Sequence, residues 1–136
     1  MERNDRIQVD GNTDFKMIMA NAYPYFAFNG LSNFEKETHT KYENTTLDWS
    51  KKYQATIVYP ISKKIDRKGG KDIYTILGFL CIDTLSVDAF AQDIGVLCLP
   101  FVESVTHLLY TFLDKTLHYG AYIYHQSHQE METESK

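Results

Sequence analysis

Two stretches in the middle of the chain carry the apolar patterns of β-strands. Residues 53–61 (YQATIVYPI) alternate and become β-branched towards their end, while residues 73–83 (IYTILGFLCID) are apolar on both period-two faces. A strand with two apolar faces needs a cover on each side. We therefore predict that residues 73–83 form the central strand of a sheet, next to residues 53–61.

The segment between these strands is basic and contains a turn dipeptide. Residues 62–72 (SKKIDRKGGKD) hold five of the 14 Lys and Arg residues of the chain, and Gly69-Gly70 supplies the turn. We expect a solvated hairpin tip, because exposed loops collect charge. The alternative is a contact with phosphate or with an acidic partner.

A long helix is predicted from residue 90 to residue 117, because apolar residues recur there every three to five positions. We expect this stripe to be buried against one face of the sheet. Its members are Ile94, Leu97, Phe101, Val105, Leu108, Phe112 and Leu117.

Three further features of this helix follow from its sequence. It is expected to bend at Pro100, the alternative being that the main helix begins there, and to end near Tyr119-Gly120. A second set of side chains, three or four positions apart, is predicted to face solvent. That set comprises Glu103, His107, Tyr110 and Asp114.

The rest of the chain has weaker patterns. Residues 1–11 are predicted to be a flexible arm, and residues 12–24 a short capped helix that Pro24 ends. Residues 25–28 (YFAF) form an edge strand or an extended pocket wall, and residues 46–51 a short helix. We place one α+β domain at 12–120, in which an antiparallel sheet is packed by the long C-terminal helix. A polar tail follows at 121–136, with its last ten residues disordered.

Length and charge limit the classes of function. A chain of 136 residues fits one domain, and its net charge of −4 offers no electrostatic footprint for nucleic acid. The chain opens without a charged segment followed by an apolar run, and Glu103, Ser104 and His107 interrupt the most apolar helix. We therefore expect no membrane span and a cytoplasmic location.

The order of motifs from residue 53 onwards resembles the C-terminal half of a GAF domain. The similarity lies in Pro60-Ile61 at a strand end, Gly78 and Asp83 in the next strand, and Phe90 and Asp93 before the helix. The resemblance implies a GAF/PAS-like regulatory domain with helices on one sheet face and a small-molecule pocket, or its vestige, on the other. It also implies dimerisation through terminal helices.

The chain departs from the GAF pattern at its front and at the family's ligand motifs. Only about fifty residues precede Tyr53, so the sheet is expected to be shortened or to be completed by another chain. The cyclic-nucleotide motif is incomplete, because Phe90 and Asp93 have the wrong spacing and the Glu is absent. The chromophore-binding cysteine of phytochromes and the catalytic cysteines of GAF-type methionine sulfoxide reductases have no counterpart. The cofactor therefore stays unassigned.

Aromatic residues before and at the first strand are the candidate ligand contacts. Tyrosine hydroxyls beside apolar rings can orient a ligand on an uncovered sheet face. The alternative is that these rings form the second half of the core. The candidate ligand residues are Tyr25, Phe28, Tyr42, Trp49 and Tyr53.

Thiol and metal chemistry receive little support from the sequence. Cys81 and Cys98 are expected to be two buried, reduced thiols. Cys81 with a distant His, such as His107, would be the nucleophile and base of a thiol-based redox enzyme. His118, His125 and His128 lack the further ligands that a zinc site needs, so we predict no metal site and no catalytic residue.

The sequence thus favours a non-catalytic, GAF-like sensory or regulatory domain that binds a small molecule or dimerises in signalling. One alternative is an assembly subunit that has only a vestigial pocket and docks a partner protein. The other is the thiol enzyme. We expect either a homodimer, formed through the final helix, or a complex with a partner protein. We assign that contact to Val102, Leu109 and Leu113.

Overall fold

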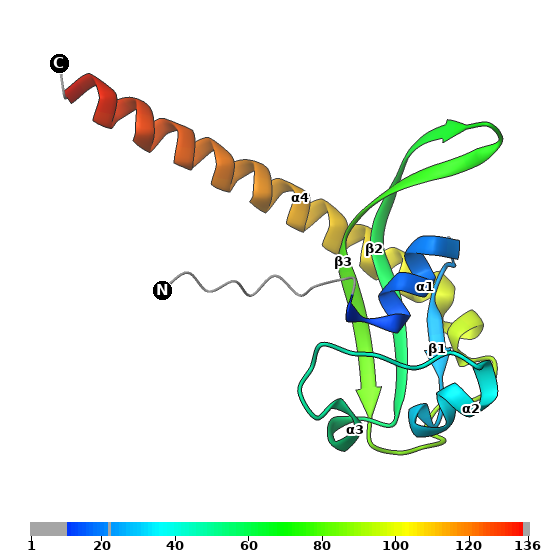
Figure 1. The fold of residues 1–136 in the computed structure, drawn as a ribbon. Helices are drawn as coiled ribbons and strands as arrows, with labels where there is room; N and C mark the ends of the chain where they lie inside the picture. The colour runs from blue at the N-terminus through cyan, green and yellow to red at the C-terminus, as the bar shows by residue number, and fades with distance from the viewer. Residues whose placement is uncertain (1–10, 22, 135–136) are drawn as a thin grey trace.

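The computed structural model describes residues 11–21 and 23–134, so most of the predicted N-terminal arm lies outside the described residues. It has an α+β fold made of a three-stranded antiparallel sheet and helices, the last of which is long (Figure 1). The elements in chain order are α1 (Thr13–Asn21), β1 (Phe26–Phe28), η2 (Leu31–Asn33), α2 (Phe34–Thr38), α3 (Trp49–Lys52), β2 (Ala55–Lys68), β3 (Lys71–Thr84) and α4 (Ile94–Glu134).

The predicted hairpin is confirmed. β2 and β3 pair antiparallel from Ala55 opposite Thr84 to Lys68 opposite Lys71. Gly69 and Gly70 turn the chain with φ of 60° and 79°, a conformation that other L-residues rarely adopt. Because the strands are 14 residues long, the hairpin extends well beyond the rest of the sheet (Figure 1).

The prediction that residues 73–83 form the central strand is wrong. The strand order is β1-β2-β3, because Phe26–Phe28 pairs with the opposite edge of β2, at Thr56 to Val58. β3 is therefore an edge strand whose side chains are half-buried or exposed. Cys81 on β3 is exposed and Cys98 half-buried, so the expectation of two buried thiols is also wrong.

Both faces of β2 are covered, by different parts of the chain. Val58 points into a core cluster with Phe15 and Ile18 of α1 and with Phe34. Ile57 and Tyr59 point the other way and pack against Val102 of α4. Alternate residues of a strand face opposite sides, so β2 joins two cores, and α1 and α4 lie on opposite sides of the sheet (Figure 1).

α4 is longer than the sequence predicts. It begins at Ile94 and continues to Glu134, so the expected end near Tyr119-Gly120 and the expected disorder of the last residues are wrong for the described part. Pro100 lies inside the helix, as one of the two readings of the sequence has it. Figure 1 shows the C-terminal part of α4 extending away from the sheet.

The predicted buried stripe of α4 is largely exposed. Phe101, Leu108 and Phe112 are 74%, 71% and 66% exposed, and Leu97 and Leu117 are exposed as well. The face that packs on the domain instead consists of Gly95, Val102, Thr106 and Tyr110, with Leu109 and Leu113 half-buried beside it.

Apolar residues on α4 cover more than one face, so periodicity alone identifies a helix but not its buried side. The buried side of α4 is the one that carries Val102, because Val102 packs on Ile57 and Tyr59 of the sheet. Tyr110, predicted to face solvent, is buried. Val102, a predicted dimerisation residue, lies in the core.

Candidate functional site

Four of the five candidate ligand residues belong to one aromatic array. Ring centroids lie 4.8 Å apart between Phe28 and Phe34, 5.4 Å between Phe34 and Tyr42, and 4.8 Å between Tyr42 and Trp49. Tyr53 continues the array, 6.0 Å from Trp49. These separations are those of packed aromatic pairs in a core.

The array is mostly closed to solvent. Tyr42 and Tyr53 are 5% and 9% exposed and belong to the core cluster around Phe34. Phe28 lines a shallow apolar hollow of about 510 Å³, but Tyr42, Trp49 and Tyr53 do not. This geometry supports the core interpretation for most of the array, and ligand binding by these residues stays a prediction.

Tyr25, the fifth candidate, faces the other core. Its ring centroid lies 5.8 Å from that of Tyr59, and its ring lies where a Cβ on Gly95 of α4 would be. The Tyr59 hydroxyl donates to the Gly95 carbonyl at 3.2 Å. Gly95 therefore lets α4 approach the sheet closely enough for two tyrosine side chains to meet it.

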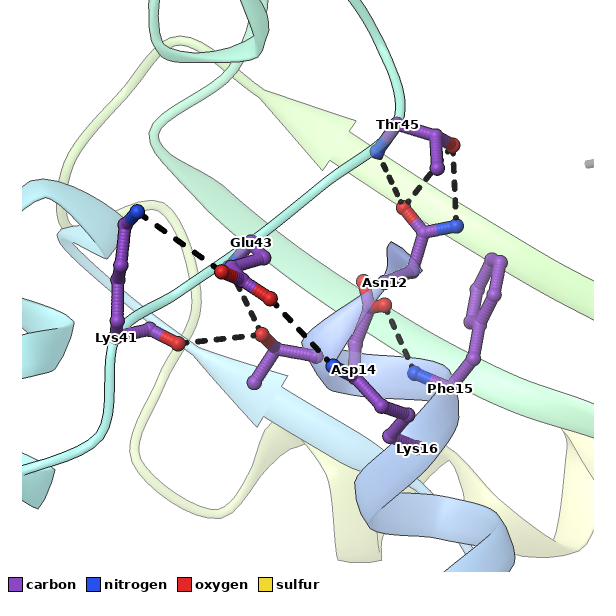
Figure 2. Close-up of polar contacts among 8 residues, drawn as sticks. Asn12, Asp14, Phe15, Lys16, Lys41, Glu43 and Thr45 are labelled. Atoms are coloured by element: carbon purple, nitrogen blue, oxygen red, sulfur yellow. Dashed lines mark hydrogen bonds and ion pairs between the residues drawn. The ribbon is translucent and has the colours of Figure 1, made fainter. Parts of the chain in front are cut away.

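A buried polar cluster ties the chain segment 41–45 to the start of α1 (Figure 2). The Thr13 amide donates to the Glu43 carbonyl at 3.0 Å, and the Glu43 amide donates to the Thr13 hydroxyl at 2.8 Å. The Thr45 amide donates to Asn12 Oδ1 at 3.0 Å. The sequence identified residues 12–14 only as helix caps, since no local pattern reveals a partner about thirty positions away.

Asp14 is the one buried carboxylate of this cluster. Its Oδ1 accepts the Phe15 amide at 2.8 Å and its Oδ2 accepts the Tyr42 hydroxyl at 3.0 Å. Burial raises the pKa of Asp14, and these two hydrogen bonds offset part of the increase. Burial and the Asp14 charge raise the pKa of Tyr42, so its hydroxyl stays protonated and serves as a donor.

The structure does not assemble the thiol and imidazole pair. Cys81 lies opposite Val58, whose side chain faces the α1 core, whereas His107 is on α4, which packs on the other face of the sheet. Although Cys81 is exposed by area, the atoms around its sulfur exclude enough water to raise the thiol pKa to about 12, and Asp83 and Asp14 add to the shift. A reactive thiolate needs the opposite, electropositive setting.

Metal binding finds no support in the described part of the chain. Among those residues no group of three or more His, Cys, Asp or Glu side chains could hold an ion. The side chains of His125 and His128 lie outside the described residues, and His118 contacts Asp114 on its own helix at 3.5 Å. The predicted absence of a metal site stays a prediction.

A cavity that the sequence did not indicate lies between the hairpin and α4. Its volume is about 460 Å³, and α1, the segment before β1, both long strands and α4 contribute to its lining. Asp72 and Tyr74 reach it from β3, and Glu103 and His107 from α4. The one sequence signal was the interruption of the apolar helix by Glu103 and His107.

The outer face of α4, on which Phe101, Leu108 and Phe112 lie, is apolar and exposed. Seven large side chains on this helix are more than half exposed: Val96, Leu97, Phe101, Leu108, Phe112, Leu117 and Tyr119. By length and composition alone, residues 94–120 are also apolar enough to cross a membrane. The expected cytoplasmic location and the expected absence of a span therefore stay predictions.

The fold and surfaces define the class as a small α+β domain with a three-stranded antiparallel sheet and a projecting C-terminal helix. Comparison with family models, with curated proteins and with solved structures finds no match. The resemblance to GAF domains stays a prediction, and function is argued from the geometry.

Proposed function

We propose that this chain is a non-catalytic interaction domain that forms a homodimer through the outer face of α4. The observation that carries the proposal is the exposure of Phe101, Leu108 and Phe112 on a helix whose opposite face packs on its own sheet. Monomeric proteins rarely leave a contiguous apolar stripe of this kind uncovered.

The spacing of the stripe favours a second helix as its cover. Phe101, Val105, Leu108 and Phe112 are separated by four, three and four residues, and Tyr119 follows seven positions later. This is the a/d spacing of a two-stranded coiled coil, in which each side chain fits between four residues of the facing helix. A second copy supplies an identical stripe, and a symmetric dimer buries both.

A membrane is the less suitable cover for the same face. A spanning helix exposes its whole circumference to lipid or to other spanning elements. Here Val102 and Tyr110 are buried, Val102 against the sheet, and Glu103, Asp114 and Lys115 lie within the apolar stretch. Docking of one outer face onto another helix is compatible with both features.

A regulatory role follows from the resemblance to GAF domains, which dimerise through terminal helices. We propose the same use for α4, with the domain acting through association in signalling rather than through chemistry. The raised pKa of the Cys81 thiol argues against thiol chemistry, because little thiolate forms near neutral pH. An assembly subunit that docks a different protein on this face is the alternative.

The test measures mass in solution by sedimentation velocity across a range of concentrations. We expect wild-type dimers, and we expect Leu108→Glu to weaken dimerisation about a hundredfold or more, since each of two copies loses an apolar contact and gains a buried charge. Ile65→Glu is the matched control, because Ile65 is 58% exposed on the hairpin and should leave the dimer intact.

Three results would overturn the homodimer. A monomeric wild-type chain at high concentration is the first, and an unchanged dimer in Leu108→Glu is the second. The third is flotation of the wild-type protein with phosphatidylcholine vesicles that Leu108→Glu abolishes, which would assign the same face to a membrane.

A further inference from the structure

The cavity between the hairpin and α4 forms where the sheet loses one of its strands. β1 pairs with β2 only up to Val58, and a register shift follows between Ile61 and Ser62. Beyond that point the sheet consists of the β2–β3 hairpin alone, and α4 lies against one side of these strands. The resulting hollow of about 460 Å³ is within the size range of small-molecule sites.

The walls of the cavity are aromatic and aliphatic. Tyr23, Tyr59 and Tyr74 line it from three different segments, and Leu99 and Val102 of α4 form part of its apolar surface. Tyr23 and Tyr74 are about half exposed, so their rings and hydroxyls are accessible from solvent. Tyrosine rings suit a ligand with a positive charge, because the face of each ring carries negative potential.

The charged groups that line the cavity are acidic. Asp72 and Glu103 are there, and no Lys or Arg is among the described lining residues. Asp72 is held in place by Lys64 at 2.7 Å and by Arg67 at 3.7 Å, so its charge is largely matched within the hairpin. Glu103 has no ion pair among the described residues of the chain and leaves one negative charge for a ligand.

We propose that this cavity binds an organic cation, a primary amine or quaternary ammonium joined to an apolar or aromatic body. The cation would lie between the Glu103 carboxylate and the ring of Tyr74. The apolar or aromatic part of the ligand would lie on the side chains of Leu99 and Val102. An anionic ligand is disfavoured, because the unpaired Glu103 carboxylate would repel it and no Lys or Arg is among the described lining residues.

This inference goes beyond the proposed homodimer and does not depend on it. Glu103 and Val102 face the hairpin and the sheet, whereas Phe101 and Leu108 belong to the outer face of α4. If homodimerisation is lost, cation binding can still be tested, and the reverse also holds. The binding experiment is therefore repeated with the Leu108→Glu variant.

Titration calorimetry and thermal shift with three related probes test the charge preference. We expect 2-phenylethylamine and benzyltrimethylammonium to bind with dissociation constants of about a millimolar or below. The neutral analogue 2-phenylethanol should bind at least about tenfold more weakly, and phenylacetate should not bind.

Two exposed lining residues provide variants that should still fold. Glu103→Gln is expected to lower the affinity for both cations about tenfold and to leave 2-phenylethanol unchanged. Tyr74→Leu should weaken benzyltrimethylammonium several-fold. Glu35→Gln, the same change on exposed α2, is the control and should have no effect. The proposal is overturned if neither cation binds, if the neutral probe binds equally well, or if Glu103→Gln has no effect.

Discussion

The Tyr42 hydroxyl donates a hydrogen bond to Asp14 Oδ2 at 3.0 Å, and the two residues are 5% and 3% exposed. This contact joins α1 to the segment before α3 across 28 positions of sequence. It also fixes Tyr42 at the centre of the aromatic array, between Phe34 and Trp49. One buried carboxylate thus holds together two parts of the chain that share no strand pairing.

Removing this hydroxyl should destabilise the domain. In Tyr42→Phe, Asp14 Oδ2 loses its donor while staying buried, and an unsatisfied buried group of this kind costs about 1–3 kcal/mol. Urea unfolding followed by tyrosine and tryptophan fluorescence measures the change in free energy. Tyr23→Phe is the control, because Tyr23 is 48% exposed and lies outside the proposed dimer contact. Equal stability of the two variants would show that the contact contributes nothing.

The Asp14 charge should make stability depend on pH in a defined direction. Burial raises the folded-state pKa of Asp14 above its ordinary value of 3.8. Between 3.8 and that higher value the folded protein binds more protons than the unfolded chain, so the contribution of Asp14 to stability falls as the pH rises. Asp14→Asn cannot ionise but keeps an acceptor for Phe15 and gains a donor for Tyr42.

We therefore expect the free energy of unfolding of Asp14→Asn, minus that of the wild type, to increase from about pH 4 to neutral pH. Urea titrations at a series of pH values give this difference, and all other ionisable groups cancel to first order. A difference that stays constant over the range, or that decreases, would contradict the raised pKa.

Gly95 should not tolerate a methyl group. A Cβ at this position would overlap the ring of Tyr25, and overpacking of a core contact costs about 1–3 kcal/mol. We expect Gly95→Ala to lower the melting temperature of the wild-type chain. In a chain that already carries Tyr25→Ala, the same Gly95→Ala change should lower the melting temperature by less. Gly120→Ala is the control, because nothing lies within 4 Å of its added Cβ. Additive effects of the two changes would refute the contact.

The Cys81 thiol should react slowly in the folded protein. Its pKa rises from 9.0 to about 12, which reduces the thiolate fraction about a thousandfold at pH 8. Iodoacetamide labelling of Cys98→Ser, followed by mass spectrometry, isolates Cys81, and the same variant in urea gives the unperturbed rate. A native rate equal to or above the unfolded rate would contradict the raised pKa of Cys81.

The hairpin and the final helix could be predicted because their signals are local. β-Branched alternation in residues 53–61 and the Gly69-Gly70 turn determine strand, turn and strand without knowledge of other segments. The recurrence of apolar residues after Phe90 identifies a helix for the same reason. Antiparallel pairing then follows from the short connection.

The position of each element in the sheet could not be predicted, because it depends on contacts between distant segments. Phe26–Phe28 is too short to reveal that it pairs with β2, yet this pairing moves β3 to the edge and exposes Cys81. The buried face of α4 depends on Val102 meeting Tyr59. A helix with apolar residues on two faces leaves that choice open in the sequence.

The sequence grouped the aromatic residues but did not establish that they contact a ligand. The aromatic residues before β2 do gather, since such rings bury together wherever the chain allows, but Tyr25 faces the opposite side of the sheet. Asp72, Tyr74 and Glu103 were missed as cavity residues. They come from a hairpin arm and a helix that meet only in the folded chain, and none of them has a distinctive sequence context.

Pro100 lies at the root of a helix that runs a further 34 residues, about 50 Å at 1.5 Å per residue. Proline removes one backbone hydrogen bond and makes this turn easier to flex than its neighbours. A tilt of about 10° there would carry the far end of the helix sideways by about 9 Å. It would also shift Val102 and Tyr110, which follow Pro100 and are buried against the domain. A small rearrangement at the base of this lever would thus become a large displacement at its tip.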